Sequence, residues 1–87
     1  MAVGDRIKRV RNFRGMTMKE LGMAVGFDEK SADVRIAQYE NNSRKPKEEL
    51  MRKIAAALDV SVAYLEDPTM NDAEGILHAL FELDDQY

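Results

Sequence analysis

The segment SADVRIAQYENN, residues 31–42, combines side chains that are suited to contacts with nucleic-acid bases. On a helical wheel, its apolar residues Ala32, Ile36 and Tyr39 share one narrow side. The broad remaining side carries Ser31, Val34, Arg35, Gln38, Asn41 and Asn42. Arg, Gln and Asn have paired hydrogen-bonding groups that match the edges of guanine and adenine, and valine suits the methyl group of thymine. The alternative is an ordinary solvent-exposed face, so the surrounding elements must decide.

Four more short helices are expected to position this segment. Apolar residues at helical spacing place them at residues 3–14, 18–25, 46–58 and 62–66. Gly15 is expected to end the first helix, and Thr17 and Glu20 form a capping box at the start of the second. Pro46 is expected as the first residue of the fourth. No long run alternates between apolar and polar residues, so the expected fold class is all-α.

Charge is distributed unevenly along the chain. The net charge of the 87 residues is −3, but residues 1–65 hold all 13 Lys and Arg and only 9 of the 16 acidic residues. Residues 66–87 hold the other 7 acids, so a basic body precedes an acidic tail, which indicates an anionic partner for the body. Cations crowd the first expected helix, either as a solvated face or as a source of long-range attraction: Arg6, Lys8, Arg9, Arg11 and Arg14.

The composition argues against several other classes of protein. The chain has no cysteine, which excludes disulfides and thiolate metal sites. Its one histidine, His78, has no second nitrogen or sulfur ligand nearby and no serine or threonine to activate, so neither a metal site nor nucleophilic catalysis is expected. No phosphate-binding glycine loop, signal peptide or membrane-spanning run occurs. We therefore expect a cytoplasmic protein that is not an enzyme, with no cofactor, membrane partner or small-molecule substrate.

Residues 3–66 resemble the lambda-repressor-like family, also called XRE or Cro-type helix-turn-helix DNA-binding domains. The resemblance rests on R-x-x-R-G-M-T at 11–17, K-E-L-G-M-A-V-G at 19–26, I-A-Q-Y-E-N-N at 36–42, a basic loop ending in Pro46, and A-A-A-L-D-V-S-V-A-Y-L at 55–65. It implies a five-helix lambda-repressor-like helix-turn-helix bundle, here followed by a C-terminal helix. It also implies a transcriptional regulator, most simply a repressor, that binds double-stranded DNA as a homodimer.

The resemblance also implies roles for individual residues. The 31–42 helix becomes the recognition helix, and the family's base-reading positions fall on Asp33, Val34 and Gln38, with Arg35 between them. We rank Gln38 and Arg35 first and Asp33 last, because an anion repels phosphate. Phosphate contacts are expected from Thr17, Lys19, Ser31, Asn41, Asn42, Arg44 and Lys45. Arg11 and Glu40 match a structural pair of the family.

The sequence departs from the family pattern at two places. The family usually has glutamine after the residue that caps the second helix, where it contacts DNA, but this chain has Met18. The span from Gly26 to Glu40 is also about four residues longer than usual, roughly one helical turn. Either FDEK forms a longer turn with Ser31 as the N-cap, which we favour, or Asp28 caps a helix that starts one turn earlier.

We expect two parts, a DNA-binding domain at 1–67 and an acidic amphipathic helix within 68–87. The stripe of that helix consists of Ile76, Leu77, Leu80 and Phe81. It is expected to pack on its own domain, to form a dimer seam, or to shield the basic face. The acidic tail and Met18 also favour a competing function, a protein-interaction module such as an antitoxin or adaptor on the same fold.

Overall fold

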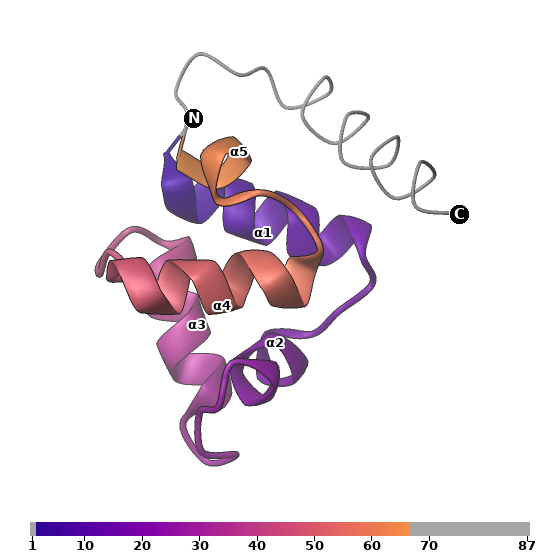
Figure 1. Cartoon of the computed structure of the whole chain (residues 1–87). Helices are drawn as coiled ribbons and strands as arrows, with labels where there is room; N and C mark the ends of the chain where they lie inside the picture. Colours follow the sequence, from indigo (N-terminus) through magenta and orange to yellow (C-terminus); the bar gives the residue numbers. More distant parts are fainter. Residues whose placement is uncertain (1, 67–87) are drawn as a thin grey trace.

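Five α-helices and their connections make up residues 2–66, which the computed structural model describes. The helices are α1 (Val3–Phe13), α2 (Met18–Ala24), α3 (Ala32–Glu40), α4 (Glu48–Leu58) and α5 (Val62–Glu66). Among these residues there is no strand, and the all-α prediction is confirmed. In Figure 1, α1 and α4 lie alongside each other, α5 sits beside the start of α1, and α2 and α3 lie below. The expected tail helix and the boundary at residue 67 fall outside the described residues.

The ends of α1 and α2 follow from short local signals. Thr17 Oγ1 accepts the Glu20 backbone N–H at 3.0 Å, and Glu20 Oε1 accepts the Thr17 N–H at 2.8 Å, so the capping box forms as expected. Hydrogen bonds from the Thr17 backbone N–H and, to a smaller extent, from the Thr17 hydroxyl lower the pKa of the Glu20 carboxyl. Gly15 and Gly26 have φ angles of +71° and +96°, which end the two helices in a conformation that other residues adopt only with strain.

The prediction that Pro46 begins the fourth helix is wrong by two residues. The helix α4 begins at Glu48, and the N-cap Lys47 is extended, with φ −71° and ψ 166°. Pro46 is buried in the connection from α3. The fixed φ of proline suits an extended backbone as well as a first helical turn, so residue type alone does not distinguish the two.

The core draws large apolar side chains from all five helices. The completely or almost completely buried ones include Ile7, Val10, Leu21, Ile36, Met51, Ile54, Leu58 and Leu65. This layer joins α1 and α4 to the α2–α3 unit and holds the short α5 in place. Within residues 2–66, every helix is too short or too polar to span a lipid bilayer.

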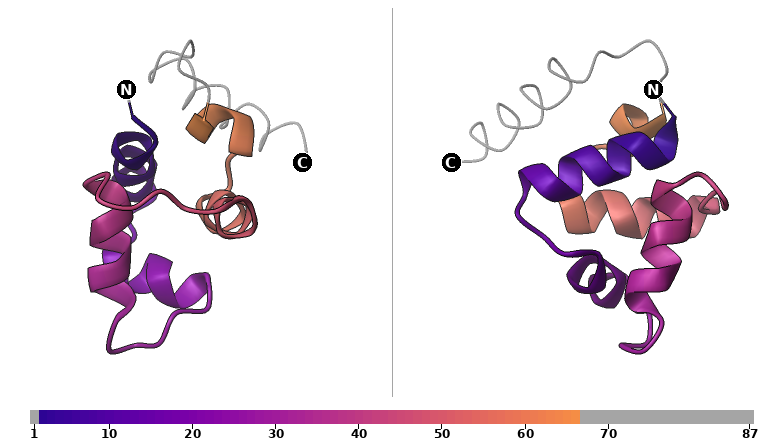
Figure 2. Two further views of the ribbon diagram at one scale, coloured as in Figure 1. Left: turned by 90° about the vertical axis from the view of Figure 1, so that its left-hand side faces the viewer. Right: turned by 180° about the vertical axis from the view of Figure 1, so that it is seen from behind.

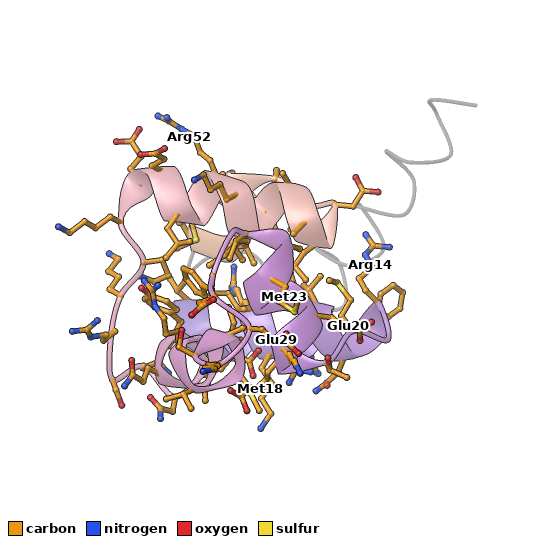
Figure 3. All side chains as sticks on the ribbon, turned by 90° about the horizontal axis from the view of Figure 1, so that it is seen from below. Arg14, Met18, Glu20, Met23, Glu29 and Arg52 are labelled. Carbon is orange, nitrogen blue, oxygen red and sulfur yellow. The ribbon has the colours of Figure 1, made fainter. Side chains whose placement is uncertain are left out.

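Three of the arginines in the first helical segment fasten the bundle instead of forming a solvated face. Arg6 is only 2% exposed and donates to the backbone oxygen of Tyr64 at 2.6 Å, which ties α5 to α1. Arg14, at the end of α1 (Figure 3), donates through Nε to the backbone oxygen of Leu58 at 2.9 Å. Arg11 is also buried. The expectation of a solvated cationic face therefore applies only to Lys8 and Arg9, which are exposed.

Candidate nucleic-acid interface

The helix α3 lies at the edge of the bundle with its outer side uncovered by the other described helices (Figure 2). Its first turn packs closely on α2: a Cβ added to Gly22 would lie 2.6 Å from the Cβ of Ala32. The buried residues of α3 include Ala32, Ile36 and Tyr39, as the helical wheel predicts. The outer side presents Val34, which is 57% exposed, and the half-buried Gln38.

The start of α3 agrees with the favoured alternative for the long connection. Residues 28–31 form a turn in which the Ser31 N–H donates to the Asp28 backbone oxygen at 3.1 Å. Ser31 occupies the N-cap position, but its hydroxyl also donates to Asp28 and makes no cap hydrogen bond. Instead, Asp33 Oδ1 accepts the Val34 N–H at 2.8 Å, which satisfies one of the free amide groups of the first turn. The Asp33 carboxylate is thus engaged with its own helix.

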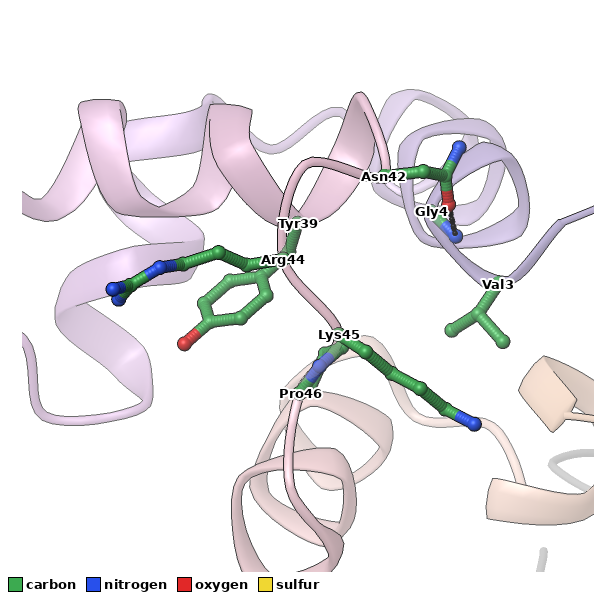
Figure 4. Close-up of a pocket in the computed structure, with 7 residues that line it drawn as sticks. All are labelled: Val3, Gly4, Tyr39, Asn42, Arg44, Lys45 and Pro46. Carbon is green, nitrogen blue, oxygen red and sulfur yellow. Dashed lines mark hydrogen bonds between the residues drawn. The ribbon is translucent and has the colours of Figure 1, made fainter.

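The end of α3 differs from the expected continuous helix over residues 31–42. The helix ends at Glu40, and Asn42 takes a left-handed conformation with φ +66°. Asn42 Oδ1 accepts the Gly4 N–H of α1 at 3.0 Å, as Figure 4 shows. Asparagine is one of the few residues that adopt this conformation readily, so Asn42 stops the helix and turns toward α1.

The expected pair of Arg11 and Glu40 joins α1 to the last turn of α3. Arg11 donates to the carboxylate through Nε at 2.6 Å and through a terminal nitrogen at 3.1 Å. Its other terminal nitrogen donates to the Met16 backbone oxygen at 2.8 Å. The pair is buried, and its two parallel hydrogen bonds hold the helix in one orientation.

Arg35, which the sequence ranks with Gln38 as a base-reading residue, does not extend freely from α3. Its guanidinium lies over the Phe27 ring, 3.7 Å from the ring centre, in a cation–π contact. Phe27 in turn stacks on Tyr39, with 6.4 Å between the ring centres. Periodicity places Arg35 on the outer side of α3. In the structure its side chain contacts Phe27, eight residues earlier, and both residues line a pocket with residues of α4.

Arg35 shares an open pocket with three cations beyond the end of α3. The pocket is lined by Arg35, Arg44, Lys45, Lys47, Tyr39 and Leu50. The Arg44 N–H donates to the Gln38 backbone oxygen at 3.1 Å, which holds the loop against α3. Figure 4 shows the Arg44 and Lys45 side chains pointing in different directions from this loop. We call Arg35, Arg44, Lys45 and Lys47 the basic flank of α3.

The opposite side of α3, next to α2, is not basic. Lys19 Nζ contacts Glu29 Oε1 at 2.9 Å, and both side chains are at least half exposed. The hydrogen bond and charge of Glu29 raise the pKa of Lys19, with a smaller contribution from the charge of Asp33, and the same pair lowers the pKa of Glu29. A phosphate contact by Lys19 must therefore compete with these two carboxylates, which with Lys19 form the acidic flank.

Comparisons with known proteins agree with this geometry. The family model described as helix-turn-helix matches residues 7–65. The chain belongs to the lambda-repressor-like helix-turn-helix family. A solved structure titled "Crystal structure of transcriptional regulator BswR" is similar, with a TM-score of 0.73 and 30% sequence identity over 100% of this chain and 95% of that chain. No curated protein sequence matches the chain.

Met18 and Lys8 also lie close to the candidate interface. Met18, at the position where the family usually has glutamine, is half-buried and packs against the core. Lys8 lines a hollow with Ala37, Glu40 and Asn41 of α3, and the sequence had grouped it with the other cations of the first helix. Lys8 lies four residues after Gly4 and three before Arg11, which both contact α3, so helical spacing could have singled it out.

Proposed function

We propose that this family member is a transcriptional regulator, most simply a repressor, that binds DNA as a homodimer with α3 in the major groove. The observation that carries the proposal is the uncovered outer side of α3 beside a flank of four cations. A groove of about 12 Å admits such a helix, and the flank can meet the phosphates at its border. Two copies related by a two-fold axis would place their helices about 34 Å apart.

Base contacts are assigned to Gln38 and Val34, and phosphate contacts to the loop after α3. Asn41, Arg44 and Lys45 keep their expected phosphate roles because they are exposed beside the uncovered helix. Thr17 and Ser31 stand at the N-termini of α2 and α3, where backbone N–H groups favour an anion. The hydroxyls of Thr17 and Ser31 already have partners within the chain, so the backbone is what these two residues offer. Asn42 and Lys19 contribute less, because their side chains are also held within the chain.

The proposal is tested by binding the full chain to random and to enriched duplexes over a range of salt concentrations. Duplex binding that selects particular sequences and falls steeply with salt supports a regulator. Weak binding without selection, together with a stoichiometric protein that co-purifies with the chain, would favour an antitoxin or adaptor. Analytical ultracentrifugation of the free and DNA-bound chain tests the homodimer.

Replacing Gln38 with alanine is expected to cost roughly 1–3 kcal/mol of binding to the enriched duplex. Binding to random duplexes should change little, because the amide reads bases and not phosphates. The measurement is a titration of both duplexes with the wild-type and Gln38→Ala chains. Equal losses on the two duplexes would remove Gln38 from the base-reading residues.

Replacing Arg44 with alanine is expected to weaken binding to every duplex by a similar factor. The slope of log K against log salt should become shallower by about 1, because one phosphate contact is lost. The matched control is Arg52→Ala, which removes the same charge from a residue paired with Glu48 that projects from α4 away from α2 and α3 (Figure 3). A slope change of equal size in the control would mean that Arg44 acts only through net charge.

A further inference from the structure

The exposed strip of α3 consists of Val34, Ala37 and Gln38, and it contains no cation. Val34 is the only large apolar side chain of α3 that is exposed, at 57%. The half-buried Ala37 and Gln38 follow it by three and four residues, so the three side chains are neighbours on one side of the helix. A DNA groove that receives the strip would therefore meet the isopropyl group of Val34, the methyl group of Ala37 and the amide of Gln38.

The exposed or half-buried charged residues of α3 beside this strip, Arg35 and Asp33, are both held by other contacts. Arg35 lies over Phe27 and lines a pocket with Lys47, the N-cap of α4, and with residues of the first turn of α4, including Glu49 and Leu50. Asp33 accepts the Val34 N–H and lies near Lys19 in the acidic flank. A guanidinium is the usual partner of guanine and a carboxylate can accept from cytosine. Neither group lies on the strip. The side chains of Arg35 and Asp33, which could select a G·C pair, are therefore held to either side of it.

We propose that α3 selects A·T pairs, with Val34 packed on the methyl group of a thymine and Gln38 hydrogen-bonded to an adenine. Arg35 then anchors phosphate together with Arg44 and Lys47 and does not choose a base. The four steps along the chain from Val34 to Gln38 rise about 6 Å along the helix, which spans one or two base-pair steps. The inference rests on the proposed function, because it specifies the DNA that the same face accepts.

The experiment begins with duplexes that the full wild-type chain enriches from a random library. Each thymine of the enriched half-site is then replaced by deoxyuridine, which removes only the 5-methyl group. At one position the wild-type chain is expected to lose affinity about fourfold, the effect of one buried methyl group. The Val34→Ala chain should lose less than about twofold at that position, because the isopropyl group that meets the methyl is gone. Replacement of thymines outside the half-site is the DNA control.

A second variant tests the role of Arg35. Arg35→Ala is expected to weaken binding to enriched and random duplexes by similar factors and to leave the preferred bases unchanged. Wild-type binding that is unaffected by every deoxyuridine, or equal sensitivity in Val34→Ala, would overturn the thymine contact. An enriched guanine whose replacement weakens the wild-type chain but not Arg35→Ala would overturn the inference and leave the proposed function intact. Failure to enrich any sequence would remove both.

Discussion

Replacing Glu40 with alanine is expected to lower the free energy of unfolding by roughly 3–5 kcal/mol. The change leaves the guanidinium of Arg11 buried without its carboxylate, since the side chains of the two residues are only 10% and 5% exposed. A buried charge without a partner is costly, whereas an ion pair that is exposed to water contributes little to stability. The loss is measured as a lower urea midpoint at an unchanged slope of unfolding free energy against denaturant.

The matched control for this substitution is Glu48→Ala. Glu48 also pairs with an arginine, but its side chain is 79% exposed, so the loss should not exceed about 1 kcal/mol. The double variant Arg11→Met with Glu40→Leu should recover much of the stability, because it removes both charges and fills their volume. A loss in Glu40→Ala no larger than in the control would show that the pair does not hold α3.

The pair is also expected to connect stability to DNA binding, because it fixes the end of α3 that leads into the loop proposed to contact phosphate. Arg11 contacts both Glu40 and the connection after α1, so it joins three segments with one side chain. Asn42 adds a second link from the end of α3 to the start of α1. The loop from Asn41 to Lys45 therefore starts from a fixed point, which is what phosphate contacts need for register.

Apolar periodicity and local helix-end signals together predict all five helices to within about two residues. Periodicity also predicted which side of α3 is buried, because Ala32, Ile36 and Tyr39 must meet the core if the helix forms at all. The turn at 28–31 was the favoured alternative, since a helix begun at Asp28 would have carried Glu29 toward DNA. In these cases the signal is local, and the tertiary structure agrees with it.

The errors concern side chains whose partners are distant or on neighbouring elements. Periodicity predicts the side of the helix on which Arg35 emerges, but not that an aromatic ring from the preceding connection lies within its reach. Arg6 looks like a surface cation until Tyr64, 58 residues later, supplies a backbone oxygen. On a helical wheel, Asn42 continues the polar side of α3. In the structure its backbone is left-handed and its side chain accepts the Gly4 N–H, so the helix ends before this residue.

Replacing Gly22 with alanine is expected to reduce both stability and DNA affinity, because this glycine sets the distance between α2 and α3. Its added Cβ would lie 2.6 Å from the Cβ, 2.8 Å from the backbone oxygen and 2.9 Å from the carbonyl carbon of Ala32. Two of these are backbone atoms, so no rotamer change relieves the overlap and α3 itself must move. Overpacking of this kind costs roughly 1–3 kcal/mol, more than the gain of about 1 kcal/mol from helix propensity can offset.

The shift of α3 should also lower the affinity of the folded chain for its enriched duplex by about tenfold or more, since the loop and the exposed strip move together relative to α2. Met23→Ala, at the next residue of α2, is the control: Met23 is 49% exposed, so its loss should stay within about 0.5 kcal/mol and leave affinity unchanged. Urea unfolding and duplex titration of both variants give the two measurements. If Gly22→Ala behaves like Met23→Ala in both, then the close approach at Ala32 does not position α3.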